Sequence, residues 1–492
     1  MLNLRKGIFL ALLVAFVSVW IACGGSDTTE PLELPPPAAG NPMPANDAAD
    51  VPHATVLQWS GVADPDGGDV KYDVYLGLSD DPPLVAEDLT TNSYQPVGVH
   101  SKRMYHWRVV AKDDENHETS SNVWAFTVMP CPPTPGTICD FAGTGIDGLG
   151  PDGQDPLDTE LYWPQDVNFD ASGNPHILDW NNHRVLVVDA QGKFKTLIGG
   201  KFGDGLDGFA ADVRLNHPTH VSFDPADDSL ILCAWHNSVI KRMDMNTTWL
   251  STFCGTGARD YNGDEIPAED AILDLPVNLI FDSQGRMYLG DQANMAVRMI
   301  DEDGIIHTVA GMPTGCGIDG QSACQGFTGD GGPATQARLN FEKGQAANPS
   351  GKICFDNDGN LLIADTKNHC VRIVDAGGII NTFAGTGANA GSDGDGGLAT
   401  AAHLTEPRDI TVDAAGNVYI ADTGNHCVRK VDAAGIITTV AGTIGVIGAD
   451  SFDAIPATQA HFYSPYGIEI GPNGNLWIAD SQNSMVRIVY LP

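Results

Sequence analysis

The sequence predicts an all-β protein whose main part is a six-bladed β-propeller. Residues 403–443 read as four short strands separated by Gly-rich turns, because apolar residues alternate or run together in DITVD, NVYIAD, HCVRKVD and IITTVAG. The Asp that ends the second strand recurs every 55 to 58 residues, apart from one spacing of 74. Such a period indicates stacked four-strand units, since one unit cannot bury both faces of its own sheet. The six equivalent positions are Asp179, Ala234, Asp291, Asp365, Asp422 and Asp480.

The sixth copy ends at Pro492, directly after its third strand, MVRIVY. Its fourth strand has a match near the start of the array, because Ile138–Gly145 (ICDFAGTG) is similar to NTFAGTG and STFCGTG in other copies. We therefore expect the N-terminal strand to complete the last blade and leave no open sheet edge between the first and last blades.

The repeated motifs P-x-D/G-I-x-V-D, G-N-x-Y-I-A-D, N-H-x-V-R-x-V-D and T-V-A-G-T resemble NHL repeats. They are clearest at Pro407–Asp413, Gly416–Asp422, Asn425–Asp432 and Thr439–Thr443. The resemblance covers about residues 136–492 and implies a propeller over residues 130–492. Some NHL propellers bind RNA through a basic surface. This chain has 26 Lys and Arg against 63 Asp and Glu, a net charge of −37, which argues against a nucleic-acid partner.

The N-terminus predicts export and a lipid anchor. Arg5 and Lys6 precede the apolar run Ile8–Ala22, and Cys23 follows. Residues 1–23 resemble a bacterial lipoprotein signal peptide with Cys23 acylated, and the alternative is an ordinary signal peptide cut nearby. The resemblance implies a protein anchored in the cell envelope, at the outer membrane or cell surface, with the periplasmic side left open. Residues 24–50 are rich in Pro, Ala, Gly and Asp and predict a disordered tether.

Residues 51–129 predict a separate β-sandwich, because six or seven short strands follow one another at regular spacing. Trp59 and Trp107 are expected in its core. The segment Tyr105–Ala111 resembles the sixth strand of fibronectin type III domains, in which such a Tyr hydrogen-bonds back to the preceding corner.

Two disulfide bonds are expected among the ten cysteines. Cys316 and Cys324 lie in the enlarged inter-blade loop, and Cys131 and Cys139 flank the junction with the closing strand. The other propeller cysteines are interpreted as small buried hydrophobic residues: Cys233, Cys254, Cys354, Cys370 and Cys427.

Polar residues that recur in nearly every copy are interpreted as structural. The Asp at the end of each second strand is expected to accept backbone N–H bonds of the following turn and to pair with a basic residue of the third strand. His183, His369 and His426 recur at one position and are interpreted in the same way. The basic residues are Lys241, Arg298, Arg372, Arg429 and Arg487.

A candidate metal set breaks the repeat symmetry two residues after the Pro that begins each first strand. Asp166, His220, Asn278 and Asp409 stand there, with Gly467 in the sixth copy and either Gly351 or Lys352 in the fourth. Carboxylate, amide and imidazole groups converging on the channel suit Ca²⁺ or another divalent metal, and Gly467 would leave a gap for water or substrate. The alternative is hydrogen bonding to channel water.

A second asymmetry is aromatic. Tyr162 and Trp163 precede the Pro of the first copy, while Phe462, Tyr463 and Tyr466 surround that of the sixth, and these copies are neighbours in the ring. Adjacent aromatic side chains on a loop rim suit a protein or carbohydrate partner. The alternative is that they pack under their own loops.

Two functions follow. The first is a monomeric, membrane-anchored binding or scaffold lipoprotein whose propeller surface meets a protein or glycan partner. The second is a metal-dependent lyase or lactonase-type hydrolase at the channel mouth, as in some six-bladed propellers. We favour the first, because the sequence shows no constellation of catalytic residues. Metal content distinguishes the two.

Overall fold

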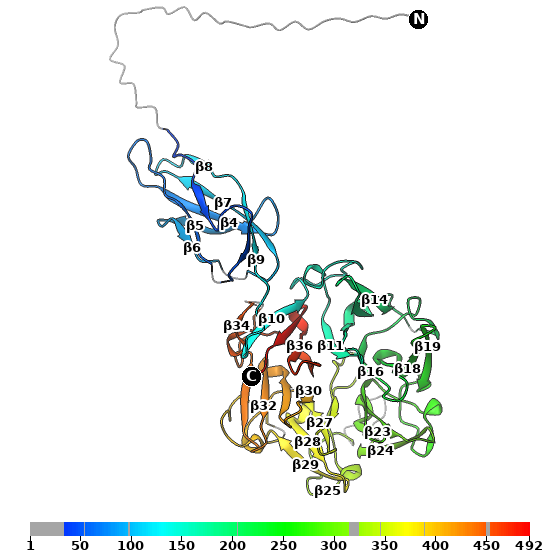
Figure 1. The fold of residues 1–492 in the computed structure, drawn as a ribbon. Helices are drawn as coiled ribbons and strands as arrows, with labels where there is room; N and C mark the ends of the chain where they lie inside the picture. Colours follow the sequence, from blue (N-terminus) through cyan, green and yellow to red (C-terminus); the bar gives the residue numbers. More distant parts are fainter. Residues whose placement is uncertain are drawn as a thin grey trace, which may run out of the picture.

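The computed structural model describes residues 34–53, 55–96, 99–203, 205–313, 324–344, 346–387, 389–448 and 453–492. The chain has two parts, an N-terminal β unit (residues 34–129) and a propeller of NHL type (residues 130–492) (Figure 1). Both consist of β-strands, and the 3-10 turns of the described residues all lie in the propeller. In the described ranges, none of the helices has the length and apolar character needed to cross a bilayer.

The N-terminal β unit contains two sheets that share one core. The smaller sheet has the order β1-β3-β6 and the larger one β2-β9-β7-β4-β5, with β8 paired to β7. Their bounds are β1 (Gly40–Met43), β2 (Ala48–Val51), β3 (Leu57–Ser60), β4 (Lys71–Gly77), β5 (Leu84–Leu89), β6 (Ser93–Tyr94), β7 (Met104–Lys112), β8 (Glu118–Ser120) and β9 (Trp124–Val128).

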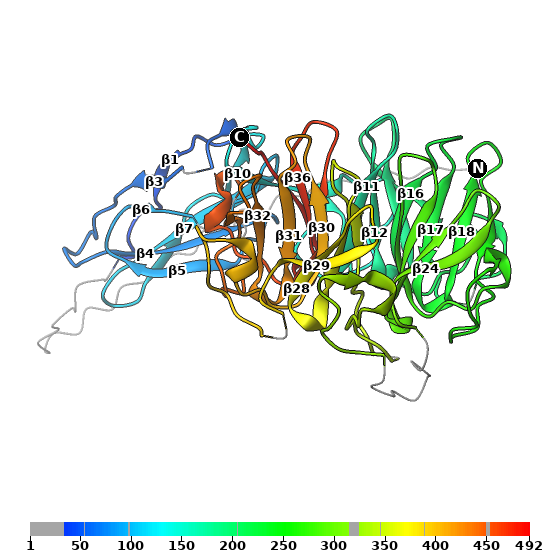
Figure 2. The ribbon, with the colours of Figure 1, turned by 90° about the horizontal axis from the view of Figure 1, so that it is seen from below.

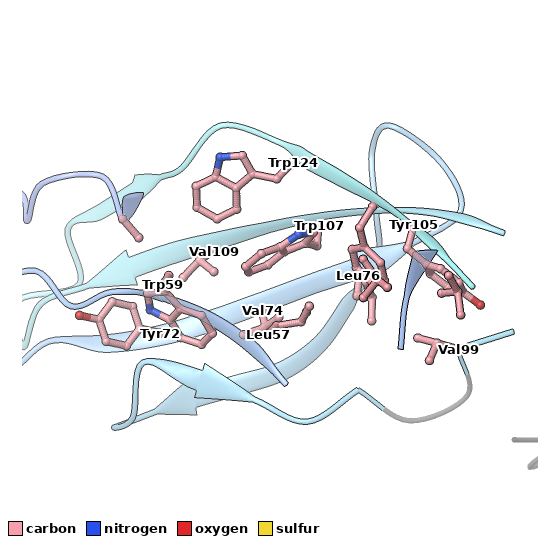
Figure 3. Packing of buried hydrophobic residues seen from close by; sticks show 14 of the residues in the cluster. Leu57, Trp59, Tyr72, Val74, Leu76, Val99, Tyr105, Trp107, Val109 and Trp124 are labelled. Carbon is pink, nitrogen blue, oxygen red and sulfur yellow. The ribbon is translucent and has the colours of Figure 1, made fainter. Parts of the chain in front are cut away.

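Aromatic side chains fill the space between the two sheets (Figure 3). Trp59 and Trp107 are both buried, as predicted, and Trp107 packs 4.8 Å from Trp124 between ring centroids. The hydroxyl of Tyr105 accepts the backbone N–H of His100 at 2.9 Å, which is the expected bond back to the preceding corner.

The structure differs from the predicted tether over residues 40–50. These residues form β1, which pairs with β3, and most of β2, which pairs with β9. Asn46 also joins this part of the chain to the unit, because its side-chain Oδ1 accepts the backbone N–H of Ala125 at 2.8 Å. Composition alone missed these strands because their ordering comes from pairing with distant strands rather than from local propensity. Cys23 and the rest of residues 1–33 lie outside the described residues.

The propeller contains six successive antiparallel sheets, numbered 1 to 6 below, each with four long strands and in four cases a short edge strand. Sheet 1 contains β11 (Pro164–Phe169), β12 (Pro175–Asp179), β13 (Arg184–Val188) and β14 (Phe194–Gly199). Sheet 2 contains β16 (Pro218–Phe223), β17 (Leu230–Ala234), β18 (Val239–Asp244) and β19 (Trp249–Cys254), with β15 (Gly208–Phe209). Sheet 3 contains β21 (Pro276–Phe281), β22 (Met287–Asp291), β23 (Ala296–Ile300) and β24 (Ile305–Gly311), with β20 (Ile266–Pro267).

The second half of the propeller follows the same plan. Sheet 4 contains β26 (Ile353–Phe355), β27 (Leu361–Asp365), β28 (Cys370–Val374) and β29 (Ile379–Ala384), with β25 (Gly332–Pro333). Sheet 5 contains β30 (Pro407–Val412), β31 (Val418–Asp422), β32 (Cys427–Val431) and β33 (Ile437–Ala441). Sheet 6 contains β35 (Pro465–Ile470), β36 (Leu476–Asp480), β37 (Met485–Val489) and β10 (Thr137–Ala142), with β34 (Ile455–Pro456).

The first strands of the six sheets line a central channel. Each contacts the first strand of the next sheet, and β35 contacts β11. Figure 2 shows the sheets of the propeller side by side, with the N-terminal β unit in blue at one end. β10 pairs with β37, with Asp140 opposite Arg487, so the N-terminal strand supplies the fourth strand of sheet 6 as predicted. Two segments more than 340 residues apart in the chain therefore hold the two ends of the array together.

The recurring Asp residues are buried and join neighbouring segments of one sheet. Their Oδ1 atoms accept a backbone N–H from the loop that leads into the first strand of the same sheet. Tyr162 donates to Asp179 at 2.8 Å, and Thr405 donates to Asp422 at 2.7 Å. The expected partners were N–H groups of the following turn, so this prediction was wrong. The pairing with basic residues is confirmed for the four Arg residues. Arg298, Arg372, Arg429 and Arg487 lie 3.3, 3.4, 3.6 and 3.6 Å from Asp291, Asp365, Asp422 and Asp480.

One predicted disulfide is present, Cys131–Cys139. Cys324 is disulfide-bonded, and Cys316, its predicted partner, lies outside the described residues. The five cysteines interpreted as hydrophobic are free thiols, and all are buried except Cys354, which is half-buried.

Candidate functional site

The channel brings together all four residues of the candidate metal set. They occupy the same register near the starts of their first strands, so they lie at one height in the channel, and all four line one cavity of about 200 Å³. The sequence left the fourth-copy position open between Gly351 and Lys352. The structure assigns it to Lys352, which lies directly before β26 and lines the same cavity.

The ammonium group of Lys352 occupies the centre of this layer. Its Nζ lies 2.8 Å from Oδ2 of Asp166 and 2.8 Å from Oδ2 of Asp409. His220 contacts Asp166 Oδ2 through Nδ1 at 2.7 Å and the carbonyl of Leu279 through Nε2 at 3.1 Å. Asn278 donates its side-chain amide to the carbonyl of Ile353 at 2.8 Å. The four predicted ligands are therefore already bonded to protein groups.

The charges of this layer follow from burial and from Lys352. Burial alone would raise the pKa of Asp166, but Lys352 and His220 hold it below its ordinary value. Burial raises the pKa of Asp409, and Lys352 offsets only part of this effect. Burial would lower the pKa of Lys352, but the two carboxylates raise it above its ordinary value, so the residue stays charged. A positive charge thus stands where a divalent cation would bind.

Gly467 does not leave the expected gap. A Cβ atom at this position would lie 2.4 Å from the carbonyl oxygen of Gln165, so the glycine is needed for close approach of β35 to β11. Within the described chain, groups of three ligand-type side chains within 4.8 Å of one another occur at the junction of the two parts and in the N-terminal β unit, not in the channel.

Glu469 is a further acidic residue of the cavity that the sequence did not single out. It is half-buried, and burial together with Asp166 and Asp409 raises its pKa to about 8. At neutral pH its carboxyl group is largely protonated. It lies two residues beyond Gly467. The sequence gives no signal for it, because Glu residues are mostly exposed in proteins.

The rim aromatics divide into two groups. Phe462 is fully buried in a hydrophobic cluster, and Tyr466 is 7% exposed with its ring 4.7 Å from the guanidinium of Arg408. These two were predicted as partner-binding residues, and they instead pack within the propeller. Tyr162 and Tyr463 are 37% and 38% exposed and remain available at the rim.

Trp163 is part of a larger surface cluster, which we call the aromatic patch. Its ring stacks on Trp180 with centroids 6.3 Å apart, and Trp180 lies 5.9 Å from Trp235. Three histidines and Phe202 continue the contacts, and Phe202 is 61% exposed. The aromatic patch contains Tyr162, Trp163, Trp180, His183, Phe202, His217, Trp235 and His236.

Two residues of the aromatic patch have unusual environments. Burial, together with His183 and His236, lowers the pKa of His217 to about 3, so this imidazole is neutral at physiological pH. Trp180 is buried, and its indole N–H has no hydrogen-bond acceptor among the described residues. A buried donor without an acceptor is unusual in native proteins, and the core tryptophans Trp59 and Trp107 share this feature.

Sequence reasoning missed Trp180 and Trp235, although the signal was present. Both follow directly after the recurring Asp or Ala at the end of the second strand. They begin the short turns η2 (Trp180–Asn182) and η3 (Trp235–Asn237), and the other four sheets have Gln292, Thr366, Thr423 and Ser481 at this place. His183, His369 and His426 act as predicted, because each Nδ1 accepts a backbone N–H from the segment leading into the next sheet.

The opposite side of the channel mouth is charged. Arg408 of sheet 5 bonds to Glu342 at 2.5 Å and to Glu406 at 3.1 Å, and it donates to the carbonyl of Pro349 at 2.7 Å. Lys367 pairs with the same two carboxylates at 3.1 and 2.6 Å. We call Glu342, Lys367, Glu406, Arg408 and Tyr466 the charged patch.

Comparisons with known proteins agree with the repeat pattern. The family profile described as teneurin NHL domain matches residues 97–353 and 386–450, and the NHL repeat profile matches residues 351–374. Human NHL repeat-containing protein 2 is 27% identical over 347 residues, covering 67% of this chain and 47% of that protein. Mouse teneurin-1 is 26% identical over 302 residues, covering 56% of this chain and 10% of that protein.

The chain therefore spans about half the length, or less, of these curated relatives. Among solved structures, a Bacteroides thetaiotaomicron protein of unknown function is similar with a TM-score of 0.51 at 16% identity. The similarity covers 93% of this chain and 98% of that one, and at this identity it bears on the fold alone.

Proposed function

This chain belongs to the teneurin NHL domain family, and from that premise we propose that it is a binding or scaffold protein whose propeller presents the aromatic patch to a protein or glycan partner. The observation that carries the proposal is the aromatic patch itself. It combines exposed rings and a neutral histidine, at a place where four of the six sheets have small or amide side chains. Flat aromatic groups beside polar donors suit sugar rings and protein hot spots.

The test compares two pairs of exposed aromatic residues in the full chain. Tyr162→Ala with Phe202→Ala removes the exposed part of the aromatic patch. Phe209→Ala with Trp249→Ala removes a similar pair on sheet 2, where the two rings lie 5.2 Å apart and both are exposed. Binding to a glycan array and to envelope proteins captured by cross-linking should fall by about tenfold or more for the first variant, as expected for a hot spot. Equal binding by both variants would refute the site.

The proposal includes export and anchoring to a bacterial cell envelope through acylated Cys23. Its support is the charged and apolar order of residues 1–23 together with the disulfide Cys131–Cys139, a bond typical of oxidising compartments. Mass spectrometry of the mature N-terminal peptide should find a lipid on Cys23, and an unmodified terminus would contradict this part of the proposal.

We also propose that the six sheets form a closed six-bladed propeller that acts as a monomer, and that the N-terminal β unit is a fibronectin III-like sandwich. The ring of contacts between first strands supports the former, and the Tyr105–His100 hydrogen bond supports the latter. Sedimentation of the purified chain should give a single species at monomer mass.

The alternative function, a metal-dependent lyase or lactonase-type hydrolase, needs a cation in the channel. The geometry favours Lys352 at that position, with its ammonium bonded to both carboxylates of the candidate set. Elemental analysis tests this directly. Stoichiometric Ca²⁺ or another divalent metal that requires Asp166 and Asp409 would favour the enzyme over the binding protein.

A further inference from the structure

Sheets 2 to 5 share a polar network near the outer edge. A Thr on the fourth strand stands directly opposite the basic residue of the third strand, as Thr382 stands opposite Arg372. A loop Asp bridges the two, since Asp330 accepts from Thr382 at 2.7 Å and pairs with Arg372 at 2.5 Å. The equivalent loop residues in sheets 2, 3 and 5 are Asp207, Asp264 and Asp395.

Sheet 6 departs from this network at one position. Asp140 of β10 stands opposite Arg487, where the other sheets have Thr, and Arg487 Nε lies 3.0 Å from Asp140 Oδ1. The loop Asp of this sheet, Asp453, keeps the bond to the backbone N–H of the fourth strand that Asp207 and Asp395 also make, and it gains a partner outside the propeller. It accepts the backbone N–H of Asp140 at 2.6 Å and, from the N-terminal β unit, the backbone N–H of Ser101 at 2.6 Å.

The N-terminal β unit adds two more contacts at the same place. His100 Nδ1 lies 2.5 Å from Asp140 Oδ2. Arg103 donates to the carbonyl of Leu157 and, at 3.4 Å, to that of Gly143, directly after β10. The disulfide Cys131–Cys139 ties the segment between the two parts to β10 as well. These contacts all hold β10 or the loops beside it.

The charges explain why the N-terminal β unit is needed there. Replacing Thr by Asp adds a buried carboxylate, and Asp140 and Asp453 are 7% and 2% exposed. Burial alone would raise the pKa of Asp140, but Arg487 and then His100 hold it below its ordinary value. Burial and the neighbouring Asp140 raise the pKa of Asp453. An isolated second carboxylate would be costly. The N-terminal β unit offsets it, because the His100 imidazole contacts Asp140, the Ser101 N–H donates to Asp453, and Arg103 adds positive charge nearby.

We infer that the N-terminal β unit is a clamp on β10, the strand that closes the propeller, and that Asp140 and Asp453 redirect the polar network of sheet 6 toward His100, Ser101 and Arg103. β10 precedes the other strands of its sheet by more than 300 residues, so only non-covalent contacts keep it beside β37 (Figure 1). Such a strand is the weakest place of a closed ring. The clamp lies where opening would begin.

Hydrogen–deuterium exchange of the full chain tests the clamp. His100→Ala with Arg103→Ala removes both side-chain contacts, and exchange of β10 (Thr137–Ala142) should speed up about tenfold or more, since hydrogen bonds to charged groups are lost. The equivalent fourth strand β33 should keep its protection. His106→Ala with Arg108→Ala is the matched control, because these residues lie in β7 of the same unit. Unchanged exchange of β10 in the first variant would overturn the inference.

Asp140→Thr is the second variant, because it restores the residue of the other sheets. Its hydroxyl can bond to Asp453 as Thr382 bonds to Asp330, so the propeller should stay folded and β10 should stay protected. Exchange at Ser101 and its neighbours should rise, because His100 loses its partner and Asp453 turns back toward the sheet. If residues 99–105 keep their protection in this variant, Asp140 does not hold the unit and the inference fails.

Discussion

At the position directly after the second strand, sheets 1 and 2 carry Trp180 and Trp235, whereas sheets 5 and 6 carry Thr423 and Ser481. The hydroxyl groups donate to the carbonyl of the Pro that begins the next sheet, Pro465 and Pro164, at 2.6 Å in both cases. The tryptophans instead pack in a hydrophobic cluster with Leu275 and Val277.

The same backbone position therefore joins adjacent sheets by hydrogen bonds on one side of the ring and by apolar packing on the other. The repeat preserves the strands and leaves this position free to vary. As a result, the channel mouth has an aromatic patch on sheets 1 and 2 and a charged patch around Arg408 on sheets 4 and 5. A ligand with one apolar face and one polar face would fit such a mouth.

Both sides of the channel mouth require an intact channel layer, in which Lys352 pairs with Asp166 and Asp409. Lys352→Met keeps most of the side-chain volume and leaves Asp166 and Asp409 buried without their shared cation. We expect a loss of about 3–5 kcal/mol in the free energy of unfolding, measured by denaturant titration. Acid pH should restore part of the lost stability, since protonation of Asp166 and Asp409 removes their buried charge.

Lys367→Met is the control for this variant. Its side chain is 33% exposed and its ammonium pairs with Glu342 and Glu406, so its loss should cost less than about 1 kcal/mol. Equal losses for Lys352 and Lys367 would show that the channel layer is hydrated rather than buried.

The apolar side can be converted into the polar one. Trp235→Thr installs the residue of sheet 5 in sheet 2, where Trp235 is fully buried and donates to Gln292 at 3.0 Å. The cavity left behind should lower stability by about 3–5 kcal/mol in chemical denaturation. Trp249→Thr, at a ring 43% exposed, should cost less than about 0.5 kcal/mol. A small effect of Trp235→Thr would mean that a hydroxyl can replace apolar packing here.

Glu469 tests the charge of the channel cavity. Its pKa of about 8 in the folded state lies above its ordinary value, so the folded protein binds a proton that the unfolded chain releases between about pH 4 and 8. Stability should fall as pH rises through this window. Glu469→Gln should remove that slope and stabilise the protein by roughly 1–2 kcal/mol at pH 8, less than the full shift implies because the group is half-buried.

Thermal melts of the two proteins between pH 4 and pH 9 measure this difference. Glu302→Gln, an exposed carboxyl of sheet 3, serves as the control and should leave the slope unchanged. If the melting temperatures of the parent and of Glu469→Gln change with pH in parallel, the carboxyl group of Glu469 is in contact with bulk water.

The strands and the closing strand were predictable because apolar periodicity and the recurring Asp report local pairing directly. The channel set was located correctly, since one register position in each first strand must face the axis. The occupant of the fourth-copy position was not predictable, because the extra residue before Lys352 left it open between Gly351 and Lys352. Lys352 pairs with both carboxylates of the candidate set, a contact that no repeat pattern predicts.

The surface residues were harder to predict for a different reason. Phe462 and Tyr466 have the same aromatic character as Tyr162, and only packing decides which rings are covered. Trp180 and Trp235 stand at a position that varies between copies and lies apart in the sequence from the aromatic residues that precede each Pro. The strands β1 and β2 were missed because their order depends on partners elsewhere in the chain.

The smallest expected effect concerns the polar side of the comparison. Thr423→Val keeps the shape of the side chain and removes the hydroxyl that bonds to the carbonyl of Pro465 at 2.6 Å. One buried hydrogen bond contributes about 1 kcal/mol, so the free energy of unfolding should fall by about that amount. Thr458→Val changes an exposed residue in the same way and should have no measurable effect. If both variants match the parent, sheets 5 and 6 are joined by packing as sheets 1 and 2 are, and the difference between the two sides lies only in their surfaces.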